Sequence, residues 1–111
     1  MLQLSRYNPT WLTRVPIAHR GLHSDGVPEN SLPAFKAAVT GGYGIELDLR
    51  MSVDGQLVVI HDATTDRMTG KSLRVSQVSA DRLSTLALAE TTFTIPTLDT
   101  ALGAIRGAVP V

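Results

Sequence analysis

Glu46, Asp48 and His61 lie inside or against the apolar runs of GIELDLRMSVDGQLVVIHD, residues 44–62, and could do chemistry there. Glu46 and Asp48 are two positions apart, so on one strand they share a face and lie about 7 Å from each other. Their like charges repel unless a positive group lies between them. A divalent cation would supply that charge, because carboxylates are usual ligands of Mg²⁺ and Ca²⁺. In the alternative arrangement, both carboxylates point into solvent from a half-exposed sheet.

The third group is His61, which a hairpin would bring to the same place. Asp54-Gly55 is a strong turn dipeptide, and a turn centred on it pairs residue 61 with residue 48. His61 would then lie beside Asp48, where an acid–base role is favoured. A shift of one residue would turn His61 to the other face, and a histidine at a strand end can also be a capping or packing residue.

Two further segments carry groups suited to an anionic substrate. His19 and Arg20 come directly after a short apolar segment, and α/β folds place reactive residues at strand ends. Arginine grips phosphate or carboxylate through two parallel hydrogen bonds, although Arg20 could equally be a capping or surface residue. Glu29 precedes an expected helix, where it could simply complement the helix dipole.

The elements that must position these groups alternate between strand and helix. Turn residues, capping residues and apolar spacing predict strands at 15–18, 44–51 and 56–62 and helices at 31–42, 79–88 and 97–107. In the last helix, Leu98, Leu102 and Ile105 form the apolar stripe and Gly107 ends the helix. Residues 63–78 are polar and read as irregular.

This alternation predicts an α/β fold with a largely parallel sheet covered by helices. A closed barrel of this kind usually needs about 250 residues, and the chain has 111. We therefore expect residues 14–111 to be the N-terminal part of a larger domain, preceded by an extension at 1–13.

The composition limits the classes of partner that the chain could bind. Ten acidic and ten basic side chains balance, which gives no electrostatic case for nucleic acid or an acidic membrane surface. No apolar run is long enough for stable membrane insertion, and residues 1–16 do not resemble a secretory signal. With no cysteine, there is neither a disulfide framework nor a cysteine metal site. Cytoplasm is the expected location.

Six motifs in order resemble the N-terminal part of the glycerophosphodiester phosphodiesterase family. They are HRG at 19–21, PENSLPAF at 28–35, ELDLRMSVDG at 46–55, VVIHD at 58–62, DRMTG at 66–70 and IPTLDTAL at 95–102. The resemblance implies a (β/α)8 TIM barrel. It also implies metal-dependent hydrolysis of a small-molecule glycerophosphodiester to sn-glycerol 3-phosphate and an alcohol.

By the same resemblance, Glu46 and Asp48 are metal ligands for Mg²⁺ or Ca²⁺, and His19 and His61 are the acid–base pair. Arg20 holds the phosphate, and Glu29 supports the substrate site. Asp62 either orients His61 or simply begins the loop. The DRMTG motif shapes that loop and has no assigned chemistry.

The family's third acidic ligand lies in an E-x-K-like segment after the IPTL helix, and the sequence stops at Val111 before any such segment. The remainder of the barrel is expected to be missing and these 111 residues alone to be inactive. Two other readings stay open. One is a phospholipase D-type enzyme acting on lysophospholipid or sphingomyelin, and the other is an inactive truncated remnant.

Overall fold

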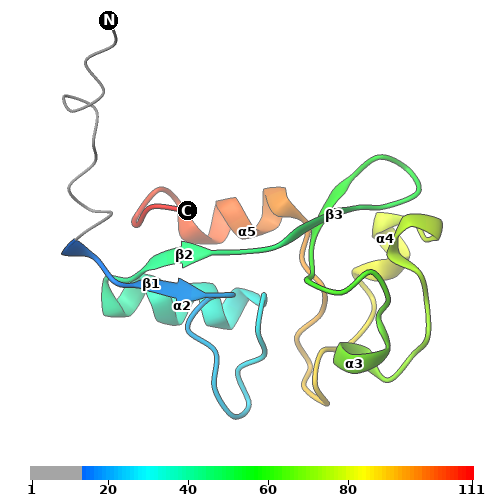
Figure 1. Ribbon diagram of the computed structural model, residues 1–111, viewed down its shortest axis with the longest axis horizontal. Helices are drawn as coiled ribbons and strands as arrows, with labels where there is room; N and C mark the ends of the chain where they lie inside the picture. Colours follow the sequence, from blue (N-terminus) through cyan, green and yellow to red (C-terminus); the bar gives the residue numbers. More distant parts are fainter. Residues whose placement is uncertain (1–13) are drawn as a thin grey trace, which may run out of the picture.

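The computed structural model describes residues 14–111, so the predicted extension at 1–13 lies outside the described residues. Figure 1 shows the arrangement of the helices and strands. In chain order they are β1 (Ile17–His19), α2 (Leu32–Gly41), β2 (Gly44–Glu46), β3 (Leu49–Met51), β4 (Leu57–Val59), α3 (Asp66–Thr69), the 3₁₀ turn η2 (Val75–Gln77), α4 (Ala80–Leu83) and α5 (Leu98–Ile105).

The first unit is β1–α2–β2, in which the two strands pair in parallel and His19 lies opposite Glu46. Ser31 caps α2 by accepting a hydrogen bond from the Ala34 N–H, and Gly42 ends the helix with φ 75°. These bounds confirm the predicted helix. The strand predicted at 15–18 overlaps β1, but β1 starts two residues later and ends one residue later. Ile17 within β1 is exposed.

The single strand predicted at 44–51 is divided between two sheets. β2 pairs with β1, whereas β3 pairs antiparallel with β4. The break falls at Asp48, whose N–H is donated to the side-chain oxygen of Asn30 at 3.4 Å. A side chain from the loop before α2 therefore takes the place of a strand neighbour.

The register of the β3–β4 hairpin differs by one residue from the predicted one. Arg50 pairs with Val58, so the loop holds three residues where the prediction had two. A two-residue type I′ turn needs positive φ at both central residues, and here only Gly55, at 77°, has it. The ladder therefore aligns Asp48 with Ile60 and not with His61. The backbone carbonyl of Asp48 accepts the Ile60 N–H at 3.1 Å.

Residues 63–78 are not wholly irregular as predicted, because they contain α3 and η2. These turns bury Met68 and Val75. The predicted helix at 79–88 is confirmed only in its first turn, α4, which Ser79 caps, although Leu83 and Leu86 are both buried.

The last helix, α5, is capped by Thr97 as predicted, but its buried stripe is Ala101 and Ile105. Leu102, expected in that stripe, is 44% exposed. With Leu98 it borders an apolar groove of about 560 Å³ against the strand residues of β1 and β2. Arg106, not Gly107, takes the left-handed C-cap position.

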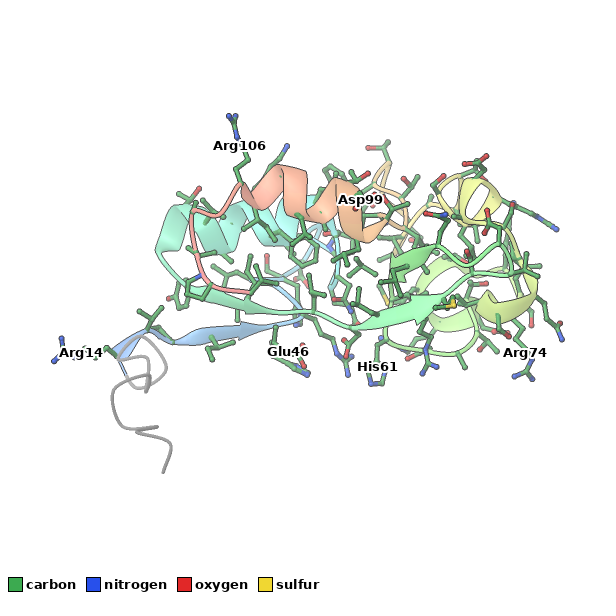
Figure 2. The ribbon with its side chains drawn as sticks, turned by 90° about the horizontal axis from the view of Figure 1, so that it is seen from above. Arg14, Glu46, His61, Arg74, Asp99 and Arg106 are labelled. Carbon is green, nitrogen blue, oxygen red and sulfur yellow. The ribbon has the colours of Figure 1, made fainter. Side chains whose placement is uncertain are left out.

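The hydrophobic core has two clusters separated by β4. Val58 and Val59 point to opposite faces of the strand and belong to different clusters. One cluster lies under α4. The other packs α2 and α5 against β1 and β2, and Figure 2 shows both helices on one side of those strands. No helix among residues 14–111 has the length and apolarity needed to cross a bilayer.

Candidate active site

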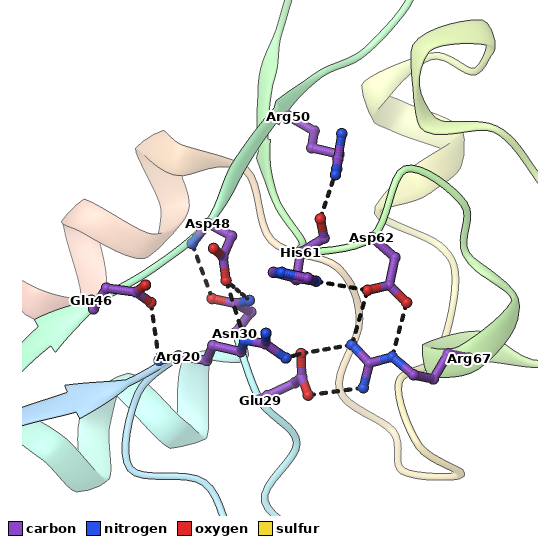
Figure 3. Close-up of polar contacts among 9 residues, drawn as sticks. All are labelled: Arg20, Glu29, Asn30, Glu46, Asp48, Arg50, His61, Asp62 and Arg67. Carbon is purple, nitrogen blue, oxygen red and sulfur yellow. Dashed lines mark hydrogen bonds and ion pairs between the residues drawn. The ribbon is translucent and has the colours of Figure 1, made fainter.

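Five of the polar residues singled out in the sequence lie together near the carboxyl ends of β1 and β2 in Figure 3, namely Arg20, Glu29, Glu46, Asp48 and His61. His19 is the last residue of β1, Glu46 is the last residue of β2, and the parallel register places them opposite each other. In α/β barrels this end of the strands is where catalytic residues lie. Both His19 and Glu46 are exposed, so their side chains are open to a ligand.

The backbone of Arg20 is bent into the left-handed region, with φ 61°. This conformation directs its N–H to Glu46 Oε1 at 3.3 Å, while its carbonyl accepts the Asn30 N–H at 2.8 Å. Strained non-glycine residues cluster at functional sites when their surroundings hold them in place. The two hydrogen bonds on either side of Arg20 hold this one.

The guanidinium of Arg20 reaches the other two carboxylates. Nη1 donates to Glu29 Oε2 at 2.9 Å, and Nε lies 3.5 Å from Asp48 Oδ2. That second distance suits an ion pair, but the buried Nε–H is misaligned and makes no hydrogen bond with the described residues. Arg20 therefore supplies positive charge beside Glu29 and Asp48, whereas Glu46 receives only its backbone N–H.

Asp48 is oriented by Asn30, a residue that is itself 3% exposed. Asn30 Nδ2 donates to Asp48 Oδ2 at 3.0 Å, and Asp48 N donates back to Asn30 Oδ1. Neither carboxylate is fully buried. Glu46 is exposed, and the Asp48 side chain retains 24% of its accessibility.

His61 enters the site from the loop after β4, with its ring turned into the cluster (Figure 3). Its Nδ1 lies 2.8 Å from Asp62 Oδ1, so Asp62 orients the imidazole. Its carbonyl accepts a hydrogen bond from Arg50 Nε at 2.8 Å. His61 thus joins the cluster although the hairpin register is not the predicted one, because it lies beyond the end of β4.

Arg67 links the two sides of the site. It donates to Glu29 from Nη1 and Nη2 at 3.0 and 2.9 Å, and to Asp62 from Nε and Nη2 at 2.8 and 3.2 Å. Hydrogen bonds from Arg67 lower the pKa of Asp62, helped by His61. Those from Arg67 also lower the pKa of Glu29 against the opposing effect of burial, with Arg20 contributing. Both carboxyl groups are therefore ionised at neutral pH.

The donor set of Glu46 and Asp48 fits a hard divalent cation. Glu46 Oε2 and Asp48 Oδ1 accept no hydrogen bond from the described residues, so each has an oxygen free to ligate. Residues 14–111 hold no group of three or more acidic or histidine side chains placed to bind an ion. Two carboxylates are nevertheless a usual protein share for Mg²⁺, which completes its shell with water and substrate phosphate.

Two residues of the site were missed by sequence reasoning. Asn30 appears in the sequence only as part of the PENSLPAF motif, and the DRMTG motif that contains Arg67 has no assigned chemistry. Each could have been suspected from its neighbours, because Asn30 follows Glu29 and Arg67 lies five residues after Asp62. Sequence spacing could not show which distant carboxylate either would contact.

Residues 19–109 match the model of the Glycerophosphoryl diester phosphodiesterase family. A glycerophosphodiester phosphodiesterase of Caldanaerobacter subterraneus is 59% identical over 54 residues, which is 48% of this chain and 22% of the relative. Glycerophosphodiester phosphodiesterase 1 of Bos taurus is 42% identical over 71 residues, or 63% of this chain and 21% of the relative. The chain thus aligns with about a fifth of the length of these curated relatives.

Solved structures of glycerophosphodiester phosphodiesterases also match this chain. A glycerophosphodiester phosphodiesterase from Agrobacterium tumefaciens matches with TM-score 0.77 and 36% identity, over 86% of this chain and 43% of that one. A phosphodiesterase from Oleispira antarctica, solved with its product sn-glycerol-3-phosphate, matches with TM-score 0.76 and 31% identity, over 87% and 42%. Residues 14–111 therefore have the fold of part of an α/β barrel, as the sequence predicted.

Proposed function

Because the chain belongs to the glycerophosphoryl diester phosphodiesterase family, we propose that it contributes the site of a metal-dependent glycerophosphodiester hydrolase. The products would be sn-glycerol 3-phosphate and an alcohol. The observation that carries the proposal is the gathering of Arg20, Glu46, Asp48 and His61 in Figure 3, at the strand ends where His19 pairs with Glu46.

In this proposal Arg20 binds the phosphate. A phosphodiester is anionic and repels nucleophiles, so positive groups must offset the charge of its phosphoryl oxygens. Nη2 of Arg20 donates to none of the described residues and is free for an oxygen of the substrate. Glu29 contributes to the substrate site through Arg20, because an anionic carboxylate would repel the phosphate directly.

Glu46 and Asp48 would hold the divalent ion, Mg²⁺ or Ca²⁺, through the oxygens that the described residues leave free. When bound, the ion polarises the phosphoryl group and neutralises its charge. Water and oxygens of the substrate phosphate would complete the shell of a bound Mg²⁺ ion.

His19 and His61 would transfer the protons. One takes a proton from the attacking water or hydroxyl, and the other gives a proton to the departing alkoxide, so the two start in opposite protonation states. Asp62 holds Nδ1 of His61, which leaves Nε2 as the nitrogen that faces a substrate.

The partner in this proposal is a small-molecule diester, and the balanced charges of the chain give no footing for nucleic acid. We also propose a cytoplasmic location, supported by the sequence features alone. Because the chain covers 43% of the Agrobacterium structure, we propose low activity for these 111 residues by themselves.

The proposal is tested by transplanting residues 19–109 into the Agrobacterium enzyme in place of the matching segment. With Mg²⁺ or Ca²⁺ the hybrid should hydrolyse glycerophosphocholine, and Glu46→Ala and His61→Ala should each reduce kcat/KM at least about 100-fold. Arg82→Ala, a change at an exposed arginine of α4, should leave the rate unchanged. Near-normal turnover in either site variant would overturn the assigned roles, and preference for lysophosphatidylcholine would favour a phospholipase-type substrate.

A further inference from the structure

Arg67 is the most heavily engaged side chain in the site, although it touches none of the groups proposed to act on substrate. Four hydrogen bonds of 2.8–3.2 Å join its guanidinium to two carboxylates, two bonds to Glu29 and two to Asp62. Figure 3 shows the guanidinium lying between them. An arginine fork that binds two carboxylates in this way fixes their relative position and angle.

Each of the two carboxylates also contacts, and thereby orients, a different group of the site. Asp62 Oδ1 lies 2.8 Å from His61 Nδ1, and Glu29 Oε2 lies 2.9 Å from Arg20 Nη1. A continuous series of polar contacts therefore runs from His61 through Asp62, Arg67 and Glu29 to Arg20. Its two ends are the proposed proton-transfer group and the proposed phosphate ligand.

Two simpler roles for Arg67 do not account for its four hydrogen bonds. As a direct phosphate ligand it would need free N–H groups, but four of its five are donated to carboxylates. As a purely stabilising ion pair it would contribute little, because its side chain is 48% exposed and water screens exposed pairs. A bidentate arginine fixes the geometry of the carboxylates that it binds, whereas a single point charge does not.

We propose that Arg67 is a positioning residue that holds Arg20 and His61 in register with each other, through Glu29 and Asp62. This inference rests on the proposed function for its significance. We call the Glu29–Arg20 contact the Arg20 arm and the Asp62–His61 contact the His61 arm. The inference predicts that changing one carboxylate disturbs only its own arm, whereas changing Arg67 disturbs both.

The lowered pKa values of Glu29 and Asp62 support this arrangement. Both carboxyl groups remain ionised, and therefore remain acceptors for Arg67, over the whole neutral range. The contacts that join the two arms are thus present wherever histidine acid–base chemistry would operate.

The experiment compares four variants of the 111-residue chain. Arg67→Lys keeps the charge but removes the fork, Glu29→Gln breaks only the Arg20 arm, and Asp62→Asn breaks only the His61 arm. Arg82→Lys is the matched control, because that exposed arginine makes no ion pair with residues 14–111. Nitrogen-15 NMR at alkaline pH reports the tautomer of neutral His61, and titration with inorganic phosphate reports the Arg20 arm.

Arg67→Lys should shift His61 away from the Nδ1–H tautomer and weaken phosphate binding at least about fivefold, the low end of measured coupling between sites. Glu29→Gln should weaken phosphate binding without changing the tautomer, and Asp62→Asn should do the reverse. Arg82→Lys should change neither.

The inference is overturned if Arg67→Lys keeps the wild-type tautomer and phosphate affinity, whether or not its urea midpoint falls. That result would leave Arg67 as a charge or a structural tie only. Failure of the wild-type chain to bind phosphate counts against the proposed phosphate site, and the His61 tautomer in Arg67→Lys then decides the positioning role by itself.

Discussion

Asn30 and Asp48 exchange two hydrogen bonds, one from Asn30 Nδ2 to Asp48 Oδ2 at 3.0 Å and one from Asp48 N to Asn30 Oδ1 at 3.4 Å. This pair fixes a proposed metal ligand and interrupts the strand in which that ligand lies. The backbone of Asn30 has φ 53°, a conformation that asparagine tolerates better than most residues. One side chain thus links the loop before α2 to the carboxylate proposed to bind the metal.

We predict that Asn30→Gly weakens the binding of Mg²⁺ or Ca²⁺ to the chain by about tenfold, the usual effect of losing a group that orients a ligand. Glycine accepts the positive φ, so the change removes the amide without straining the backbone. Calorimetric titration with each ion measures the effect. Ala89→Gly is the control, because it relaxes another positive φ (48°) and removes no polar side chain. Unchanged affinity in Asn30→Gly would show that Asp48 needs no support from the amide.

We predict that the free energy of unfolding falls as the pH decreases below about 5. Arg67 lowers the pKa of Glu29 and Asp62 in the folded state, relative to ordinary values of 4.5 and 3.8. The unfolded chain therefore binds protons first. The stabilisation is complete above the ordinary values and is lost as the pH falls through the lower, folded-state values.

Urea denaturation at a series of pH values between 2 and 7 measures this dependence. In Arg67→Met the slope below pH 5 should be shallower, because two carboxylates lose the partner that lowers their pKa. Arg82→Met should keep the wild-type slope. Equal slopes in the wild type and Arg67→Met would mean that Arg67 does not hold these carboxylates in solution.

We predict that Gly21→Ala destabilises the fold by about 3 kcal/mol, more than the 1–2 kcal/mol typical of a left-handed residue alone. Gly21 has φ 78°, and a Cβ there would lie 2.8 Å from Ala34 Cβ and 3.0 Å from Phe35 Cδ1. Gly26 has nearly the same φ, 75°, with nothing within 4 Å of its Cβ position.

Comparing urea midpoints of Gly21→Ala and Gly26→Ala therefore separates steric overlap from backbone strain. Gly21→Ala should also weaken phosphate binding, because the clash lies one residue from Arg20. Equal destabilisation by the two changes would show that α2 moves freely away from the HRG turn.

Local sequence signals predicted the elements that are stabilised by their own residues. Ser31, Thr97 and Gly42 lie at the helix ends where capping preferences place them. The chemistry-bearing groups were identified for a similar reason. Ionisable residues at the ends of apolar segments stand out in sequence. Arg20, Glu46, Asp48 and His61 lie together (Figure 3), and His19 pairs with Glu46 at the ends of β1 and β2.

The sequence alone also determined the family and the α/β alternation, because both depend on the order of short motifs. Tertiary structure alone decided the hairpin register, the buried face of α5 and the partners of Asn30 and Arg67. Each of these depends on contacts between residues far apart in the chain. Arg67 and Glu29, 38 positions apart, meet only because α3 and the loop before α2 fold next to each other, and no local propensity encodes that contact.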